Sequence, residues 1–237
     1  MKAGFVESVT DTLLADGTLG RGDSVLAVCA GLRERDLLAE RGFTRVVISN
    51  LEAEADMSPF EWSREDAQAL SFEDGSFEFA LVVAGLHHCS SPHRALVEMY
   101  RVARKGILVV EARDGLLTRA AVRLGLAEEY ELSAVEAHDG NAGGADDSPV
   151  PNHVYRWTED ELRKTIRSAD PTGEPSFRFF YALDVPRFYP AELPLRAVAH
   201  FFPRLGNTMA MVALRPRELF PWLAVEGGRT VFRPSRP

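Results

Sequence analysis

Apolar runs of strand length alternate with stretches of helical periodicity over the first half of the chain. The apolar runs predict strands at 24–30, 45–50, 79–84 and 107–111. The intervening and preceding stretches have apolar residues at helical spacing and predict helices at 5–19, 33–41 and 95–103. Strands that alternate with helices pair in parallel through right-handed crossovers, so this pattern indicates an α/β domain.

The second half of the chain shows further elements around a polar, glycine-rich stretch. An apolar helix is expected at 116–126, followed by a mobile loop at 138–152. Thr158 with Glu161 three residues later predicts the start of a helix that ends near residue 168. Two further strands are expected at 177–183 and 208–214, whereas 51–65 and the tail from 215 show no regular pattern.

The chain is expected to form one domain over residues 1–237. Residues 115–157 form an insertion of a helix and a mobile loop, which we expect to act as a lid over the acceptor site. A second insertion, 185–206, is rich in Pro and aromatic residues.

Composition and charge narrow the class of protein. The 237 residues, 46% of them apolar, are enough for a full core, and the net charge of −8 disfavours a nucleic-acid partner. Cys29 and Cys89 are the only cysteines, which favours reduced thiols and a cytoplasmic location. We expect no signal peptide and no membrane span. The oligomeric state stays open, with a homodimer as one option.

Four motifs between residues 66 and 114 carry a family resemblance. They are Asp66-Ala67 with Leu70, Asp74-Gly75-Ser76-Phe77, Leu86-His87-His88 and Glu98-Met99-Tyr100-Arg101-Val102. In order and spacing they resemble the class I S-adenosylmethionine-dependent methyltransferases, in particular the small-molecule branch of the ubiquinone/menaquinone-biosynthesis type. The resemblance begins near Val25, covers about the first half of the chain, and weakens beyond Asp114. It implies a Rossmann-like, mostly parallel seven-stranded sheet with helices on both faces, and S-adenosylmethionine as the cofactor.

The resemblance also assigns a cofactor site at the carboxyl ends of the strands. The residues expected to bind S-adenosylmethionine are Cys29, Ala30, Gly31, Arg33, Asn50, Asp66, Ala67, Ala84 and Gly85. Asn50 would hold the ribose, and Asp66 with Ala67 the adenine. The turn after the first strand departs from the family pattern, which has an acidic residue at Ala27 and glycines at Cys29 and Arg33.

Each of these assignments has a structural alternative. Arg33 would bind the methionine carboxylate, or else belong to an ordinary strand-to-helix turn. Asn50 is also a common residue at the end of a strand, and Asp66 also fits a solvated loop. Trp62 would wall the adenine or belong to the core.

The catalytic candidates are His87 and His88, because imidazole is a suitable base for a hydroxyl acceptor. Alternatively, one ring packs under the cofactor and the other caps the following helix. These two with Cys89 and His93 match no common zinc spacing, so no metal is expected. His138, Asp139 and Asp147 are a weaker cation candidate, for which a solvated loop is the simpler interpretation.

Four residues are expected on the acceptor side of the site. Glu111 and Arg113 follow a strand at the ligand edge, and Tyr155 and Arg156 precede the capped helix. For Arg113, an internal ion pair is the favoured alternative.

The leading functional hypothesis is methyl transfer to a small molecule, with O-methylation favoured and N- or C-methylation open. The alternative is a non-catalytic S-adenosylmethionine-binding protein, because the turn after the first strand lacks the family's acidic residue and two of its glycines. A dinucleotide-dependent oxidoreductase and a serine hydrolase are disfavoured, since the chain lacks G-x-G-x-x-G and G-x-S-x-G.

Overall fold

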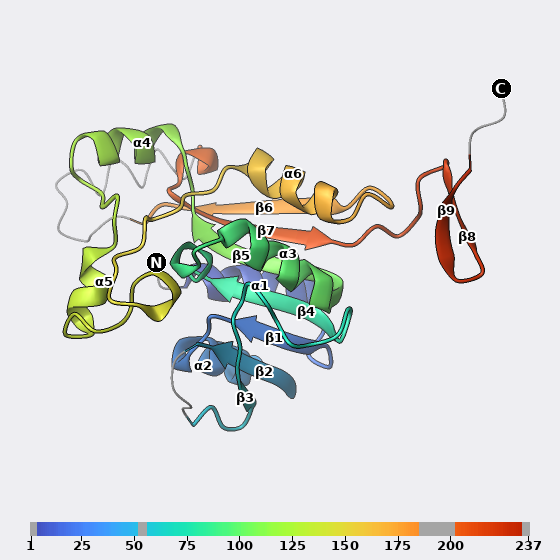
Figure 1. The fold of residues 1–237 in the computed structure, drawn as a ribbon, viewed down its shortest axis with the longest axis horizontal. Helices are drawn as coiled ribbons and strands as arrows, with labels where there is room; N and C mark the ends of the chain where they lie inside the picture. The colour runs from blue at the N-terminus through green and yellow to red at the C-terminus, as the bar shows by residue number, and fades with distance from the viewer. Residues whose placement is uncertain (1–3, 52–55, 185–201, 234–237) are drawn as a thin grey trace.

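A seven-stranded sheet organises the molecule, as Figure 1 shows. The computed structural model describes residues 4–51, 56–184 and 202–233. The strands, in sheet order, are β3 (Glu61–Arg64), β2 (Arg45–Asn50), β1 (Ser24–Val28), β4 (Phe77–Val83), β5 (Ala103–Ala112), β7 (Thr208–Leu214) and β6 (Ser176–Ala182). The first five pair in parallel, and β7 is antiparallel to both β5 and β6. The predicted Rossmann-like, mostly parallel fold is confirmed.

Helices cover both faces of the sheet, so each strand contributes to two cores. Helices α1 (Phe5–Ala15) and α2 (Leu32–Glu40) pack on one face, and α3 (Pro92–Val102) and α6 (Glu159–Ala169) pack on the other. The side chains of β1 alternate between the two cores, because successive residues of a strand point to opposite faces. Burial on both faces explains why the central strands appear in the sequence as continuous apolar runs.

Helix α6 begins at the cap that the sequence predicts. The Thr158 hydroxyl accepts a hydrogen bond from the backbone N–H of Glu161, and the Glu161 carboxylate accepts one from the backbone N–H of Thr158 at 2.9 Å. This reciprocal pair satisfies two donors that a helix start would otherwise leave free. Leu162 and Ile166, one turn apart, then enter the core beside α3.

Four elements lie where the sequence predicted no helix or strand. Strand β3 is short and lies at the sheet edge, and helix α5 (Leu132–Ala137) has one turn and a half. The tail forms a separate hairpin of β8 (Leu223–Glu226) and β9 (Arg229–Phe232), which stands away from the body in Figure 1. Most of the predicted 185–206 insertion lies outside the described residues.

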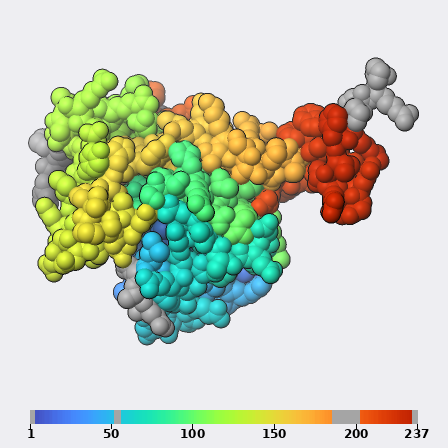
Figure 2. All heavy atoms as spheres, in the orientation of Figure 1, coloured from blue at the N-terminus to red at the C-terminus, as the bar shows by residue number. Residues whose placement is uncertain are grey.

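The inserted segment 115–157 forms one end of the molecule. It contains α4 (Leu116–Arg123), α5 and the short helix η2 (Ala145–Asp147). In the space-filling view of Figure 2, its yellow-green atoms form a rim beside the blue and teal strand segments. Among the described residues, no helix is both long and apolar enough to cross a membrane.

Candidate active site

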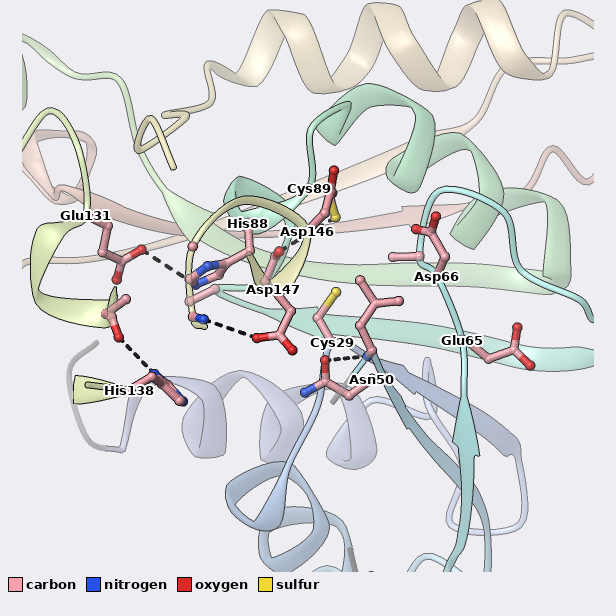
Figure 3. A pocket seen from close by; sticks show the side chains of 17 residues that line it. Cys29, Asn50, Glu65, Asp66, His88, Cys89, Glu131, His138, Asp146 and Asp147 are labelled. Atoms are coloured by element: carbon pink, nitrogen blue, oxygen red, sulfur yellow. Dashed lines mark hydrogen bonds and ion pairs between the residues drawn. The ribbon is translucent and has the colours of Figure 1, made fainter. Parts of the chain in front are cut away.

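A pocket of about 280 Å³ opens between the strand ends and the inserted segment (Figure 3). The strand side and the loops that follow it contribute Cys29, Asn50, Leu51, Glu65, Asp66, Ala67, Ala84, Gly85, His88 and Cys89. The insertion contributes Glu131, Ala134, His138, Gly143, Gly144, Asp146 and Asp147. Seven of the predicted site residues therefore line one cavity, at the sheet edge where ligands of open α/β folds bind.

Two tight turns let the backbone approach this pocket. Cys29 after β1 and Ala84 after β4 both adopt the left-handed conformation, with φ of 50° and 52°. A Cβ atom at Gly85 would lie 2.5 Å from Cβ of Cys29, which only glycine avoids. The ends of β1 and β4 can therefore come together here, although the turn after β1 lacks most of the family's glycines.

Asn50 and Asp66, which the sequence assigns to the ribose and the adenine, both line the pocket. Asn50 lies at the end of β2, where its side-chain oxygen accepts a hydrogen bond from Leu51 N at 2.8 Å. Asp66 Oδ1 accepts hydrogen bonds from the backbone and side-chain nitrogens of Gln68, at 2.8 and 3.2 Å. Both side chains support local turns and also face the pocket, so the structural and the ligand-binding interpretations are compatible.

Three residues after β1 that were expected to contact the cofactor do not line the pocket. Ala30 is buried and donates its backbone N–H to Ser49, and Gly31 caps α2 with its N–H bonded to Glu34. Arg33 lies in the first turn of α2 and is exposed. None of the three lines the pocket. The left-handed turn at Cys29 starts the helix at Leu32, so position 33 falls on the solvent face.

His87 and His88 have different environments. His87 is 8% exposed, with Nδ1 2.9 Å from Glu111 Oε2 and Nε2 3.2 Å from Glu131 Oε2. His88 lines the pocket, and its Nε2 lies 3.5 Å from the same Glu131 oxygen. Asn152 Nδ2 lies 3.3 Å from Glu131 and holds it in place. His87 thus lies beneath the pocket, as in the structural alternative, whereas His88 faces it.

The two carboxylates determine the charges of this cluster. Burial alone would lower the pKa of His87, but Glu111 and Glu131 outweigh burial and raise it to about 10. The hydrogen bond from His87 lowers the pKa of Glu131 to about 2. Burial, together with the neighbouring His87, lowers the pKa of His88. These shifts favour a cationic His87, a neutral His88 and an anionic Glu131.

Glu111 and Arg113 do not reach the pocket. Glu111 is fully buried and accepts hydrogen bonds from the backbone N–H groups of Gly85 and Leu86, at 2.9 and 2.7 Å. Glu111 holds the turn after β4 in place from the protein interior. Because it is fully buried, a substrate in the pocket cannot contact it. Arg113 pairs with Glu159 at 3.0 Å, which is the internal ion pair favoured as the alternative.

Tyr155 and Arg156 line a different hollow, whose lining shares no residue with the main pocket. The Tyr155 hydroxyl donates to Glu161 at 2.8 Å, and its ring contacts those of His93 and Trp157. Arg156 donates to two backbone carbonyls of the insertion. Both residues join the insertion to the start of α6, so their expected role in the acceptor pocket is not supported by their position.

The insertion contributes acidic groups to the pocket, of which the sequence singled out Asp147, as a weak cation candidate, but not Asp146. Asp146 Oδ1 accepts hydrogen bonds from Gln68 Nε2 at 3.0 Å and from Ser90 N at 2.9 Å, which ties η2 to the strand side. Asp147 accepts from the backbone N–H of Gly143 at 3.1 Å. The only signal for these contacts was the unusual density of Asp and Gly in the loop.

Carboxylates dominate the charge of the pocket. Among the described residues that line it, five are acidic, namely Glu65, Asp66, Glu131, Asp146 and Asp147, and none is Lys or Arg. Such a cavity favours ligands that carry positive charge, as a sulfonium does, and disfavours an anionic acceptor.

Other sequence candidates have clear places. Trp62 packs against the core on the α1 side and lies outside the pocket lining, as its core interpretation predicted. His138 and Asp147 line the pocket, whereas Asp139 is exposed. Cys29 and Cys89 are free thiols. A hydrogen bond with Cys89, together with burial, raises the pKa of Cys29 well above its usual range, so this thiol stays protonated.

Comparisons with known proteins agree with this architecture. Residues 33–110 match the methyltransferase domain family. A demethylmenaquinone methyltransferase of Bacteroides fragilis is 28% identical over 96 residues, 39% of this chain and 39% of that protein. The chain is thus matched to well under half the length of this curated relative.

Solved structures extend the likeness over nearly the whole fold. A possible histamine N-methyltransferase of Thermotoga maritima has a TM-score of 0.51 at 17% identity, covering 89% of this chain and 92% of its own. Magnesium protoporphyrin IX methyltransferase of Synechocystis, with bound S-adenosylhomocysteine, has a TM-score of 0.53 at 17% identity, covering 89% and 81%. The chain therefore has the fold of these S-adenosylmethionine-dependent methyltransferases, and its residues 33–110 match a methyltransferase domain. The resemblance seen in the sequence is confirmed, and S-adenosylmethionine is the cofactor of this class.

Proposed function

We propose that the protein transfers a methyl group from S-adenosylmethionine to a small-molecule acceptor, with an oxygen acceptor favoured. One observation carries the proposal. Cys29, Asn50 and Asp66, predicted for the turn that approaches the cofactor, for the ribose and for the adenine, line a single pocket at the ends of β1 and β2 and after β3. The acidic lining also suits a cofactor with a positive sulfonium.

The acceptor would bind near His88 and Glu131. Figure 3 shows these two residues at one side of the pocket, with Asp66 and Glu65 at the other. A cofactor whose adenine contacts Asp66 would extend toward Cys29 and Gly85, with its methyl group directed at the remaining space. Imidazole and carboxylate groups there can accept a hydrogen bond from a hydroxyl and position its oxygen for in-line attack.

The lining also narrows the acceptor class. An anionic acceptor would meet repulsion from the carboxylates, so a neutral or cationic molecule is preferred. The B. fragilis relative is named for demethylmenaquinone, so neutral ring compounds are the first to test. The net charge of −8 supports a small molecule over nucleic acid, and the two free thiols fit a reducing, cytoplasmic setting.

The second candidate is a non-catalytic cofactor-binding protein, because the turn after β1 lacks the family's acidic residue and most of its glycines. Measurement of cofactor binding by calorimetry, together with S-adenosylhomocysteine release in the presence of neutral phenols and quinols, distinguishes the two. Methyl transfer predicts binding and release that depends on the hydroxyl compound. Binding without release, across hydroxyl, amine and ring-carbon acceptors, would favour the second candidate. Absence of binding at millimolar cofactor would contradict both.

A further inference from the structure

We propose that Nε2 of His87, Nε2 of His88 and Oε2 of Glu131 form a binding site for one divalent transition-metal ion of the Zn²⁺ type. These three groups are a possible ligand set within the described part of the chain, with all ligand atoms inside 4.8 Å of one another. The sequence predicted no metal because His87 and His88 are adjacent and match no zinc spacing. The fold adds Glu131, which lies 43 positions after His88 in the chain.

The two separations that involve Glu131 suit tetrahedral coordination, and all three ligand atoms lie within 4.8 Å of one another. With metal–ligand bonds near 2.0–2.1 Å, the ligand atoms of a tetrahedron stand about 3.3–3.5 Å apart. Nε2 of His87 lies 3.2 Å from Oε2 of Glu131, and Nε2 of His88 lies 3.5 Å from the same oxygen. Two histidines and one glutamate form a known catalytic zinc set, in which the fourth position is left for water or substrate.

The surrounding groups restrain two of the three candidate ligands. A histidine that binds a metal through one nitrogen usually donates the other N–H to a carboxylate or a backbone carbonyl. Nδ1 of His87 lies 2.9 Å from Oε2 of fully buried Glu111. Buried Asn152 contacts Glu131 and restrains it. His87 and Glu131 thus each have an outer partner.

The charge balance also favours a divalent ion. Fully buried Glu111 and partly buried Glu131 are two carboxylates beside the imidazole of buried His87. A divalent cation at this point would compensate both carboxylates. The burial of charge is less costly when it is compensated in this way.

The site opens toward the pocket, because His88 and Glu131 line it. A metal ion there would bind the acceptor's oxygen at its fourth coordination position. It would thereby favour the deprotonated form of the acceptor's hydroxyl. This role toward the acceptor rests on the proposed methyl transfer, whereas the binding of the ion does not.

Titration of the chelator-treated full chain with Co²⁺ and Zn²⁺ tests the site. We expect one Co²⁺ per chain with the intense visible absorption of tetrahedral cobalt, and displacement of Co²⁺ by Zn²⁺. Glu131→Gln should lower the Zn²⁺ affinity by more than about tenfold, since loss of even an outer partner costs that much. The matched control is Glu128→Gln, three residues earlier and exposed, which should bind as the parent does.

Three outcomes would overturn the site: no cobalt band in the parent, Zn²⁺ affinity unchanged by Glu131→Gln, or equal losses in both variants. Circular dichroism establishes that each variant is folded, and the parent's cobalt spectrum is informative whether or not the variants fold. Calorimetry of S-adenosylhomocysteine with metal-free protein separates this inference from the proposed function. Cofactor binding without metal binding would contradict only the site, whereas metal binding without cofactor binding would contradict only the function.

Discussion

At the scale of single residues, strand ends were predictable and contacts across the pocket were not. Asn50 and Asp66 line the pocket, as expected for polar residues that follow strands at the ligand edge. Glu131 and Asp146 were missed because the insertion that carries them has no fixed spacing to any motif. Arg33 lies exposed in the first turn of α2 and outside the pocket lining, so its contact with the methionine carboxylate stays a prediction.

Asp66→Asn should weaken S-adenosylhomocysteine binding by about 1–3 kcal/mol, the usual loss when a charged acceptor is removed. Asparagine can still accept the Gln68 bonds through Oδ1, so the loop should keep its shape. Asp56→Asn is the matched control, because Asp56 makes the same local bond to a backbone N–H two residues on and lies outside the pocket lining. Calorimetry showing equal affinities for both variants would refute the adenine assignment.

At the scale of elements, local signals found most helices and strands. The cap at Thr158 and the apolar runs of β4 and β5 were sufficient because tertiary packing agrees with them. Strand β3 was missed because its four residues are only half-buried or exposed and show no apolar alternation. The β8–β9 hairpin was missed although the sequence contains a typical hairpin turn. Gly227-Gly228 form a two-residue turn in which both φ are positive.

Thr158→Ala should lower the free energy of unfolding by about 1 kcal/mol, the typical value of an N-cap. The substitution removes the acceptor for Glu161 N and leaves the packing of α6 unchanged. Thr12→Ala is the control, an exposed threonine within α1 that caps nothing and should change stability little. Urea unfolding of both variants gives the comparison, and equal midpoints would contradict the capping role.

Asp146→Gly should weaken S-adenosylhomocysteine binding by about 1–2 kcal/mol, the net worth of the two hydrogen bonds that close η2 over the pocket. Glycine readily adopts the positive φ of 51°, so the substitution should not strain the backbone. Asp139→Gly, with φ of 54° in the same insertion but outside the pocket lining, is the control. Equal calorimetric affinities would show that η2 is a spacer and not a lid.

At the scale of the whole molecule, the fold separates the candidate site from the tail. Every residue that lines the pocket lies at or before position 147, whereas β8 and β9 lie at the opposite end in Figure 1. The sequence predicted the parallel strands β1, β2, β4 and β5 because alternating strands and helices have strong periodic patterns. It did not predict how far the insertion enters the cofactor pocket, because loop placement depends on contacts distant in sequence.

Removal of the residues after Phe220 should therefore leave S-adenosylhomocysteine affinity unchanged. Phe220 N donates to Thr172 O, so the cut preserves the last backbone bond to the sheet domain. The comparison is calorimetry of the truncated and full chains, with thermal unfolding to confirm folding. Lost affinity in a folded truncated chain would mean that the hairpin contributes to the site.

The most direct test of the central claim is a crystal structure of the protein with S-adenosylhomocysteine. The account predicts the adenine beside Asp66 and Ala67, the ribose at Asn50, and the sulfur near the turn that contains Gly85. Ligand bound instead in the hollow lined by Tyr155 and Arg156, or no ligand in the main pocket at saturating concentration, would contradict it.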